Sequence, residues 1–143
     1  MAVNTVPVDY VLDDQIGFLL RLASQRHSGI FQRNVVGKLT PTQFSTLIRI
    51  SEQGEVSQNR LGRLAAMDVA TIKGVVDRLK AKGLVQAHAD PKDKRRIAIS
   101  LTATGHQIMD DLKRAGLEIS DLTLEPLTEA ESQTLVTLLK KIS

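Results

Sequence analysis

Hydrophobic residues recur at every third or fourth position over most of the chain, which is the spacing of amphipathic helices. This pattern predicts helices at residues 9–33, 40–54, 57–65, 68–83, 102–124 and 128–142. Residues 84–89 and 96–101 depart from it, and the second of these segments alternates Ile97, Ile99 and Leu101 with other residues, as a strand does. The sequence therefore predicts a mainly α fold with a small β-hairpin, preceded by a loose arm over residues 1–8.

Capping residues mark where most of these helices begin. Thr40-Pro41-Thr42-Gln43 predicts a capping box, in which the Thr hydroxyl and the Gln side chain each accept a backbone N–H, with proline at the first helical position. Thr128 and Glu131 predict a second capping box at the last helix. The expected single caps of three other helices are Ser57, Asp68 and Thr102.

Residues 56–102 combine two short helices, joined by a tight turn, with a basic hairpin. Such a helix pair lays its second helix in the DNA major groove, and a hairpin that follows it reaches an adjacent phosphate or minor groove. Residues 57–101 contain ten Lys or Arg and four Asp, a net charge of +6, while the whole chain carries +3. This asymmetry indicates a face that attracts a polyanion, although a solvated basic surface would give the same charge. We therefore predict a winged helix-turn-helix at residues 40–101.

The first turns of the second helix supply the candidate base contacts, because these turns enter the groove. Lys73 suits guanine O6 and N7, and Ala70 or the Thr71 methyl group suits a thymine methyl group. Glycine inside a helix costs about 1 kcal/mol relative to alanine. Gly74 thus indicates either close approach to DNA or close packing on a neighbouring helix. The candidate DNA contacts from the first helix of the pair are Ser57, Gln58 and Asn59.

The turn at residues 90–96 is the other candidate DNA contact. Asp90 and Asp93 are expected to bond its backbone and to hold Arg95 or Arg96. An ordinary polar turn is the alternative interpretation. The turn follows directly after the helix that is expected to enter the major groove, and this position favours contact with a phosphate or a minor groove. The four cationic candidates in this turn are Lys92, Lys94, Arg95 and Arg96.

Composition excludes several classes of function. The chain of 143 residues contains no cysteine, which removes disulfides, thiolate metal sites and thiol redox sensing. His27, His88 and His106 are far apart in the sequence and form no H-x-x-x-H pair, so we expect no metal site and no cofactor. The sequence shows no nucleophile with a base and no phosphate-binding glycine loop, so we expect no enzyme.

The N-terminus has neither the basic region nor the apolar core of a signal peptide, and the aliphatic runs are short. We therefore expect a soluble, cytoplasmic protein without a membrane partner. The first helix and the last two helices carry more apolar residues than a lone winged helix could cover. This excess predicts a helical dimerisation region at residues 9–33 and 102–143.

The order of these elements, together with two short motifs, resembles the MarR family of bacterial and archaeal transcription regulators. The resemblance covers roughly residues 10–142 as one domain. It implies a homodimer formed by the terminal helices, a palindromic operator, and repression relieved by a small ligand. The wing arginine of the family pattern falls on Arg95, which would enter a minor groove. The motif residues are Asp77-Arg78-Leu79 with Lys82-Gly83-Leu84-Val85, and Asp93-Lys94-Arg95 with Leu101-Thr102 and Gly105.

The resemblance also implies an organic effector, a phenolic compound or an aromatic acid, held between the dimer helices and the winged domain. The candidate ligand contacts are Arg21 and His27, which suit a carboxylate, and Phe44, which suits a ring. Plain core packing for Phe44 and a surface or interface ion pair for Arg21 are the alternatives. A winged-helix module that binds proteins and not specific DNA is the alternative function.

Overall fold

A computed structural model describes residues 6–143. It is mainly helical with one small antiparallel sheet, as the sequence predicts. A short 3-10 turn, η1 (Leu12–Asp14), precedes the first helix. The helices are α1 (Ile16–Asn34), α2 (Pro41–Gln53), α3 (Gln58–Leu64), α4 (Val69–Ala81), α5 (Ala103–Leu124) and α6 (Glu129–Ile142). The strands are β1 (Glu55–Ser57), β2 (Val85–Ala89) and β3 (Ile97–Leu101).

The sheet has three strands, whereas the sequence predicts only the β2–β3 hairpin. Strand β1 pairs antiparallel with β3, so the order is β1-β3-β2, with Val56 opposite Ile99. A strand of three residues is too short to show alternation, and its partner lies more than forty residues away in the sequence. Ile97 also departs from the predicted alternation, because it is exposed while Ala98 and Ile99 are buried.

The first helix begins seven residues later than the predicted start at Asp9. Gln15 has extended backbone angles, and its side-chain amide donates to the Val11 carbonyl, so the chain turns through η1 before α1 begins. The apolar spacing over Leu12 and Ile16 predicts one continuous helix, but local backbone bonding interrupts it. The described part of the predicted arm, residues 6–8, has no helix or strand, and residues 1–5 lie outside the described structure.

All five predicted helix caps are present. Thr40 and Gln43 form a capping box at α2, with Pro41 at the first helical position. Thr128 and Glu131 form another at α6. The side chains of Ser57, Asp68 and Thr102 accept backbone N–H groups at the starts of α3, α4 and α5.

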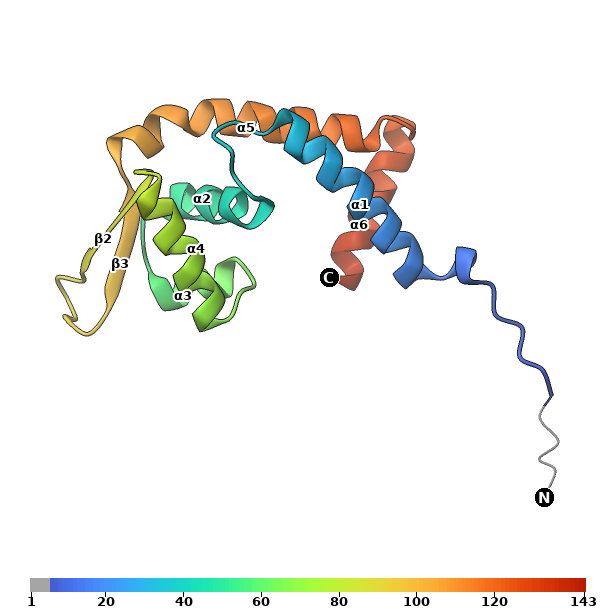
Figure 1. Cartoon of the computed structure of the whole chain (residues 1–143), viewed down its shortest axis with the longest axis horizontal. Coiled ribbons are helices and arrows are strands. Elements are labelled where there is room, and N and C mark those ends of the chain that lie inside the picture. The colour runs from blue at the N-terminus through green and yellow to red at the C-terminus, as the bar shows by residue number, and fades with distance from the viewer. Residues whose placement is uncertain (1–5) are drawn as a thin grey trace, which may run out of the picture.

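Helix α2 lies at the centre of the winged lobe, against α3, α4 and β3 (Figure 1). Leu47, Ile50, Leu61, Val76 and Ile99 are fully buried there. Helix α5 crosses the molecule above this lobe and packs against α1 at its far end. One hydrophobic core therefore joins α2, α3, α4 and the sheet, and Met109 and Leu112 of α5 belong to it.

The start of α5 is fixed to the end of α4. The Thr102 hydroxyl donates to the Gly83 carbonyl at 2.6 Å, and the Thr102 amide donates to the Leu84 carbonyl at 3.1 Å. Gly105 lies directly against that same carbonyl group, and a Cβ there would overlap its oxygen. The position of α4 is therefore tied to the direction of α5.

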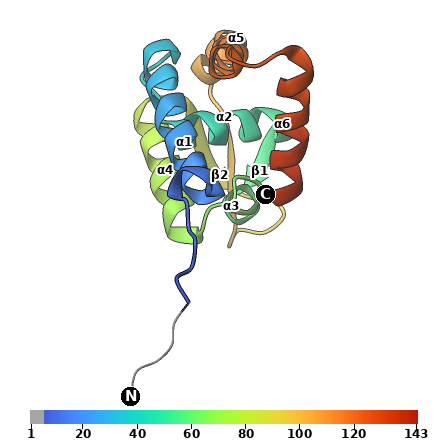
Figure 2. The same ribbon diagram turned by 90° about the vertical axis from the view of Figure 1, so that its right-hand side faces the viewer.

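Helices α1 and α6 descend on opposite sides beneath the end of α5 (Figure 2). Helix α6 is described in full and contains no buried residue. Helix α1 buries only Ile30 and Phe31, near its C-terminal end. Exposed large apolar residues of this region include Leu12, Ile16, Leu19, Leu20, Leu22, Leu135, Val136, Leu138 and Ile142. Within residues 6–143, no helix is long and apolar enough to cross a membrane.

Candidate nucleic-acid interface

The turn between α3 and α4 is tight because Gly62 permits close contact. A Cβ on Gly62 would lie 3.1 Å from the Met67 carbonyl oxygen and 3.2 Å from Ile72 Cγ2. The Met67 amide donates to the Gly62 carbonyl at 2.8 Å, and Ala66 takes a positive φ of 55° to close the turn. This geometry fixes α4 across α3, which leaves the N-terminal end of α4 free to project from the lobe.

Asp68 caps α4 and fixes its N-terminal end. Its Oδ1 accepts the Thr71 backbone N–H at 2.7 Å, and bonds from the backbone and side chain of Thr71 lower the pKa of Asp68 below its ordinary value of 3.8. The carboxylate is therefore ionised at neutral pH. Ala70, Thr71 and Lys73 are all exposed on this end of the helix.

Lys73 is paired within its own helix. Its Nζ lies 3.0 Å from Asp77 Oδ2, one turn later, while 65% of the Lys73 side chain stays exposed. The hydrogen bond from Lys73 lowers the pKa of Asp77, and Lys80, 3.9 Å from the other oxygen, lowers it further. The predicted base-contacting cation is thus held by a carboxylate on the same exposed face.

Gly74 does not pack closely on a neighbouring helix. A Cβ at this position would meet only the end of the flexible Arg78 side chain, at 3.3 Å. Of the two interpretations of this glycine, close helix packing is wrong, and close approach of a ligand such as DNA remains a prediction.

The wing is held by its two aspartates, as expected for residues 90–96. Asp90 Oδ1 accepts the Lys92 amide at 2.9 Å, and Asp93 Oδ1 accepts the Arg95 amide at 3.1 Å. The Asp93 carboxylate also lies 3.3 Å from Arg95 Nε and 3.8 Å from Arg96 Nε. Even so, 92% of the Arg95 side chain is exposed, so its guanidinium is positioned but available. Lys92 and Lys94 are exposed at the tip.

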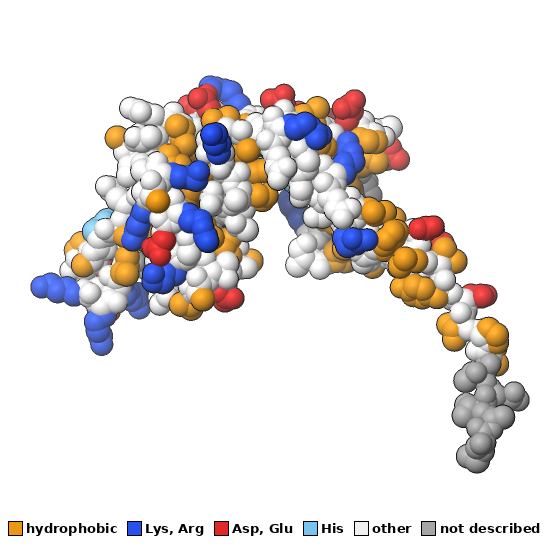
Figure 3. Space-filling view, viewed as in Figure 1, with side chains coloured by type: hydrophobic (Ala, Val, Ile, Leu, Met, Phe, Trp, Pro, Cys, Tyr) orange, Lys and Arg blue, Asp and Glu red, His pale blue; other side chains and the backbone are white. Residues whose placement is uncertain are grey.

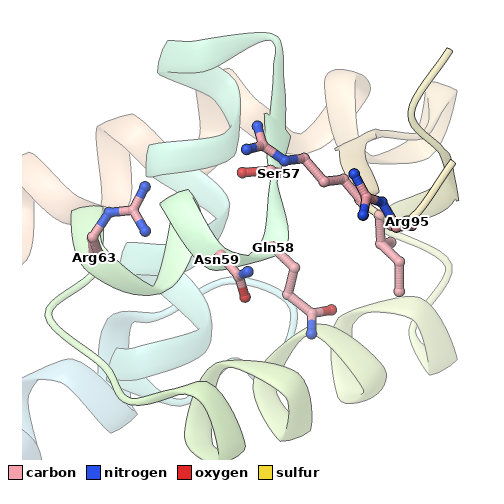
Figure 4. A pocket seen from close by; sticks show the side chains of 7 residues that line it. Ser57, Gln58, Asn59, Arg63 and Arg95 are labelled. Carbon is pink, nitrogen blue, oxygen red and sulfur yellow. The ribbon is translucent and has the colours of Figure 1, made fainter. Parts of the chain in front are cut away.

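A hollow of about 220 Å³ lies between α3 and the wing, the hairpin with its turn at residues 90–96 (Figure 4). Ser57, Gln58 and Asn59 line it from the start of α3, and Arg95 and Arg96 line it from the wing. Three groups of predicted DNA contacts therefore lie on one lobe, namely those on α3, on α4 and on the wing. Lys and Arg side chains gather over this lobe and at the wing tip (Figure 3).

The sequence reasoning missed three residues of this surface. Val69 is 68% exposed, although its spacing from Ile72 and Val76 fits the buried stripe of α4, because nothing covers the first turn. Arg63 and Ile97 line the hollow between α3 and the wing. The polar face of α3 was a usable signal for Arg63, whereas the exposure of Val69 and Ile97 depends on the tertiary arrangement.

A second hollow, of about 170 Å³, lies between α1, α2 and α5. It brings together His27 and Phe44, two of the three predicted ligand contacts. Arg21 is not among its lining residues, and its guanidinium carbon lies 5.6 Å from the Phe18 ring centroid. The residues that line this second hollow are His27, Phe31, Pro41, Phe44, Ser45, Gly116, Ile119 and Ser120.

Polar and aromatic groups are fixed at the edge of the second hollow. His27 Nδ1 lies 2.8 Å from the Thr123 hydroxyl, which also donates to the Ile119 carbonyl at 2.8 Å. A hydroxyl has one proton, so in this arrangement Nδ1–H donates and Nε2 remains open. The Phe44 ring packs edge-on against Phe31, with centroids 5.7 Å apart. Among the described residues, no group of three His, Cys, Asp or Glu is placed to hold a metal ion.

Comparison with known proteins supports the resemblance to the MarR family. The model of the MarR family matches residues 39–97. The transcriptional repressor NicR of Pseudomonas putida is 38% identical, over 97% of this chain and 90% of that protein.

Two solved structures resemble nearly the whole chain. A probable transcriptional regulator from Pseudomonas aeruginosa is 47% identical, with a TM-score of 0.90, over 93% of this chain and all of that one. BpsR of Bordetella bronchiseptica, whose DNA binding is regulated by 6-hydroxynicotinic acid, is 36% identical, with a TM-score of 0.88, over 94% of this chain and 97% of that one.

Proposed function

Because the chain belongs to the MarR family of transcription regulators, not of enzymes, we propose that it is a homodimeric repressor of a palindromic operator, released by a small aromatic acid. The observation that supports this most strongly is that Arg63 of α3, Lys73 of α4 and Arg95 of the wing are all exposed on the winged lobe. The relatives named as a repressor and as a regulator responsive to 6-hydroxynicotinic acid support the regulatory part.

In this proposal α4 enters the major groove with Val69, Ala70, Thr71 and Lys73 toward the bases. Val69 and Ala70 are exposed and apolar, which suits thymine methyl groups, and Lys73 suits a guanine. Arg95 enters the flanking minor groove, where narrow A·T-rich segments attract arginine. The start of α3 lies on the phosphate backbone between them.

In the proposed homodimer, the second copy of the chain covers α1 and α6. Monomeric proteins rarely leave large contiguous apolar faces exposed, and α6 carries Leu135, Val136 and Leu138 without burying any residue of its own. A twofold axis beside these helices would place two copies of α4 on one side of the DNA. Their half-sites would then be about one helical turn, roughly 34 Å, apart.

The effector is proposed to bind in the second hollow, between α1, α2 and α5. A dry cavity of roughly 150 Å³ is known to accept benzene, so about 170 Å³ suits a single six-membered ring. Phe31 and Phe44 offer aromatic faces or edges, His27 Nε2 offers an acceptor for a ligand hydroxyl group, and the Ser120 hydroxyl can donate to a carboxylate. A ligand here touches α2, which packs on α4 in the winged lobe.

Selection of bound sequences from random DNA, followed by sedimentation of the complex, tests the proposal. We expect an enriched palindrome that binds two chains, and release of that DNA by 6-hydroxynicotinic or benzoic acid. Arg95→Ala should weaken operator binding and reduce the salt dependence by about one counterion. Arg114→Ala on α5 removes an equally charged surface residue as the matched control. Binding of a single chain, or no enriched sequence, contradicts the proposal.

A further inference from the structure

Gly116 stands in the middle of α5, a helix of 22 residues, where glycine weakens the helix relative to alanine. No turn or positive φ requires glycine at this place. The neighbouring ring supplies the reason. A Cβ on Gly116 would lie only 2.8 Å from Phe44 Cζ, closer than real side chains approach, with Phe44 Cε1 at 3.5 Å.

Phe44 cannot easily move away from this contact. Its ring is held edge-on by Phe31, and the side chain packs against both the core of the winged lobe and the smaller cluster of Ile30, Phe31 and Ile119. A methyl group at position 116 would therefore push the ring toward the space it borders. That space is the hollow lined by His27, Ser45 and Ser120.

We propose that Gly116 is the residue that determines which ring the hollow accepts, by letting the Phe44 ring lie directly against α5. This inference rests on the proposed function, because it assumes that the aromatic effector binds in this hollow. With glycine, the hollow takes one six-membered ring with a carboxylate. With any larger residue, the displaced Phe44 ring occupies part of the same volume.

Binding of 6-hydroxynicotinic and benzoic acids, measured by calorimetry on the full-length protein, tests the inference. The variants are Gly116→Ala, Phe44→Leu and the double variant. Gly29→Ala on α1 is the matched control, because its Cβ would meet only the end of the flexible Arg33 side chain. We expect Gly29→Ala to bind as the wild type does and Gly116→Ala to bind about tenfold or more weakly.

The double-mutant cycle separates this effect from a general loss of structure. Leucine lacks the Cζ atom that Gly116 faces, so Gly116→Ala should cost much less affinity in the Phe44→Leu background. The same four proteins should show this coupling in their unfolding midpoints. Equal losses in both backgrounds, or full binding by Gly116→Ala, overturn the inference alone. If the wild type binds neither acid, the effector part of the proposed function fails and the inference fails with it.

Discussion

Lys73 and Asp77 lie 3.0 Å apart on the exposed face of α4, one turn from each other. The carboxylate is ionised, because Lys73 and Lys80 both lower its pKa. In the free protein, therefore, the cation that is proposed to read a base is already partly neutralised. In the proposed complex, Lys73 would share its ammonium group between Asp77 and the nucleic acid, which would weaken nonspecific attraction at this face.

Removing that carboxylate should strengthen DNA binding without improving its selectivity. Asp77→Asn frees Lys73, so we expect the salt dependence of binding to steepen by about one counterion. Affinity for scrambled DNA should rise more than affinity for the operator. Asp111→Asn on α5, which breaks a similar pair with Arg114, is the control. Fluorescence anisotropy over a salt series measures the two affinities and their salt dependence. An unchanged salt dependence in Asp77→Asn would show that Asp77 does not restrain Lys73 on DNA.

Breaking the apolar face of α6 should dissociate the dimer. Leu135→Glu places a charge where the second copy is proposed to pack, so sedimentation should show monomers and operator affinity should fall by more than about tenfold. Gln133→Glu adds the same charge on another side of α6 and should leave the dimer intact. If Leu135→Glu still sediments as the wild type does, α6 is not the dimer contact.

The Thr102–Gly105 junction should be intolerant of a single methyl group. In Gly105→Ala the Cβ overlaps the Leu84 carbonyl oxygen, which is backbone and cannot swing aside. Such overpacking typically costs about 1–3 kcal/mol in the free energy of unfolding. Gly29→Ala should be neutral or slightly stabilising by the same urea denaturation. Equal stability of the two variants would mean that α5 shifts freely relative to α4.

Asp68 should contribute a pH-dependent part of the stability. Bonds from Thr71 lower its pKa in the folded protein below 3.8, so folding favours the ionised form. This contribution is complete above the ordinary pKa and is lost as the pH falls through the lower folded value. Asn caps helices about as well but does not titrate. As the pH falls below about 4, the unfolding midpoint of Asp68→Asn should therefore decrease less than that of the wild type. Parallel plots of unfolding midpoint against pH for the two proteins would contradict this prediction.

Local signals in the sequence were sufficient for most of the fold. The caps at Thr40, Asp68 and Thr128 depend on residues within three positions, and each is present. The wing turn was likewise predictable, because Asp90 and Asp93 bond the backbone of their own loop.

Features that depend on distant partners could not be predicted. Strand β1 exists because Val56 meets Ile99. The late start of the first helix is instead a local effect that apolar spacing does not reveal, because Gln15 bonds to Val11, four residues earlier. Nothing in the sequence distinguishes Gly116 from other helical glycines, because its contact with the Phe44 ring depends on the packing of α2 on α5. For the ligand hollow, residue type indicated His27 and Phe44, but only the packing of α1 on α5 brings them together.

The specificity ratio of the wild type tests the central claim most directly. Anisotropy titrations should compare the selected palindrome with a scrambled duplex of the same composition, at two salt concentrations. A sequence-specific regulator should prefer the palindrome by about a thousandfold or more, and the preference should persist at the higher salt. Equal affinity for the two duplexes, lost in parallel as salt rises, would contradict the account.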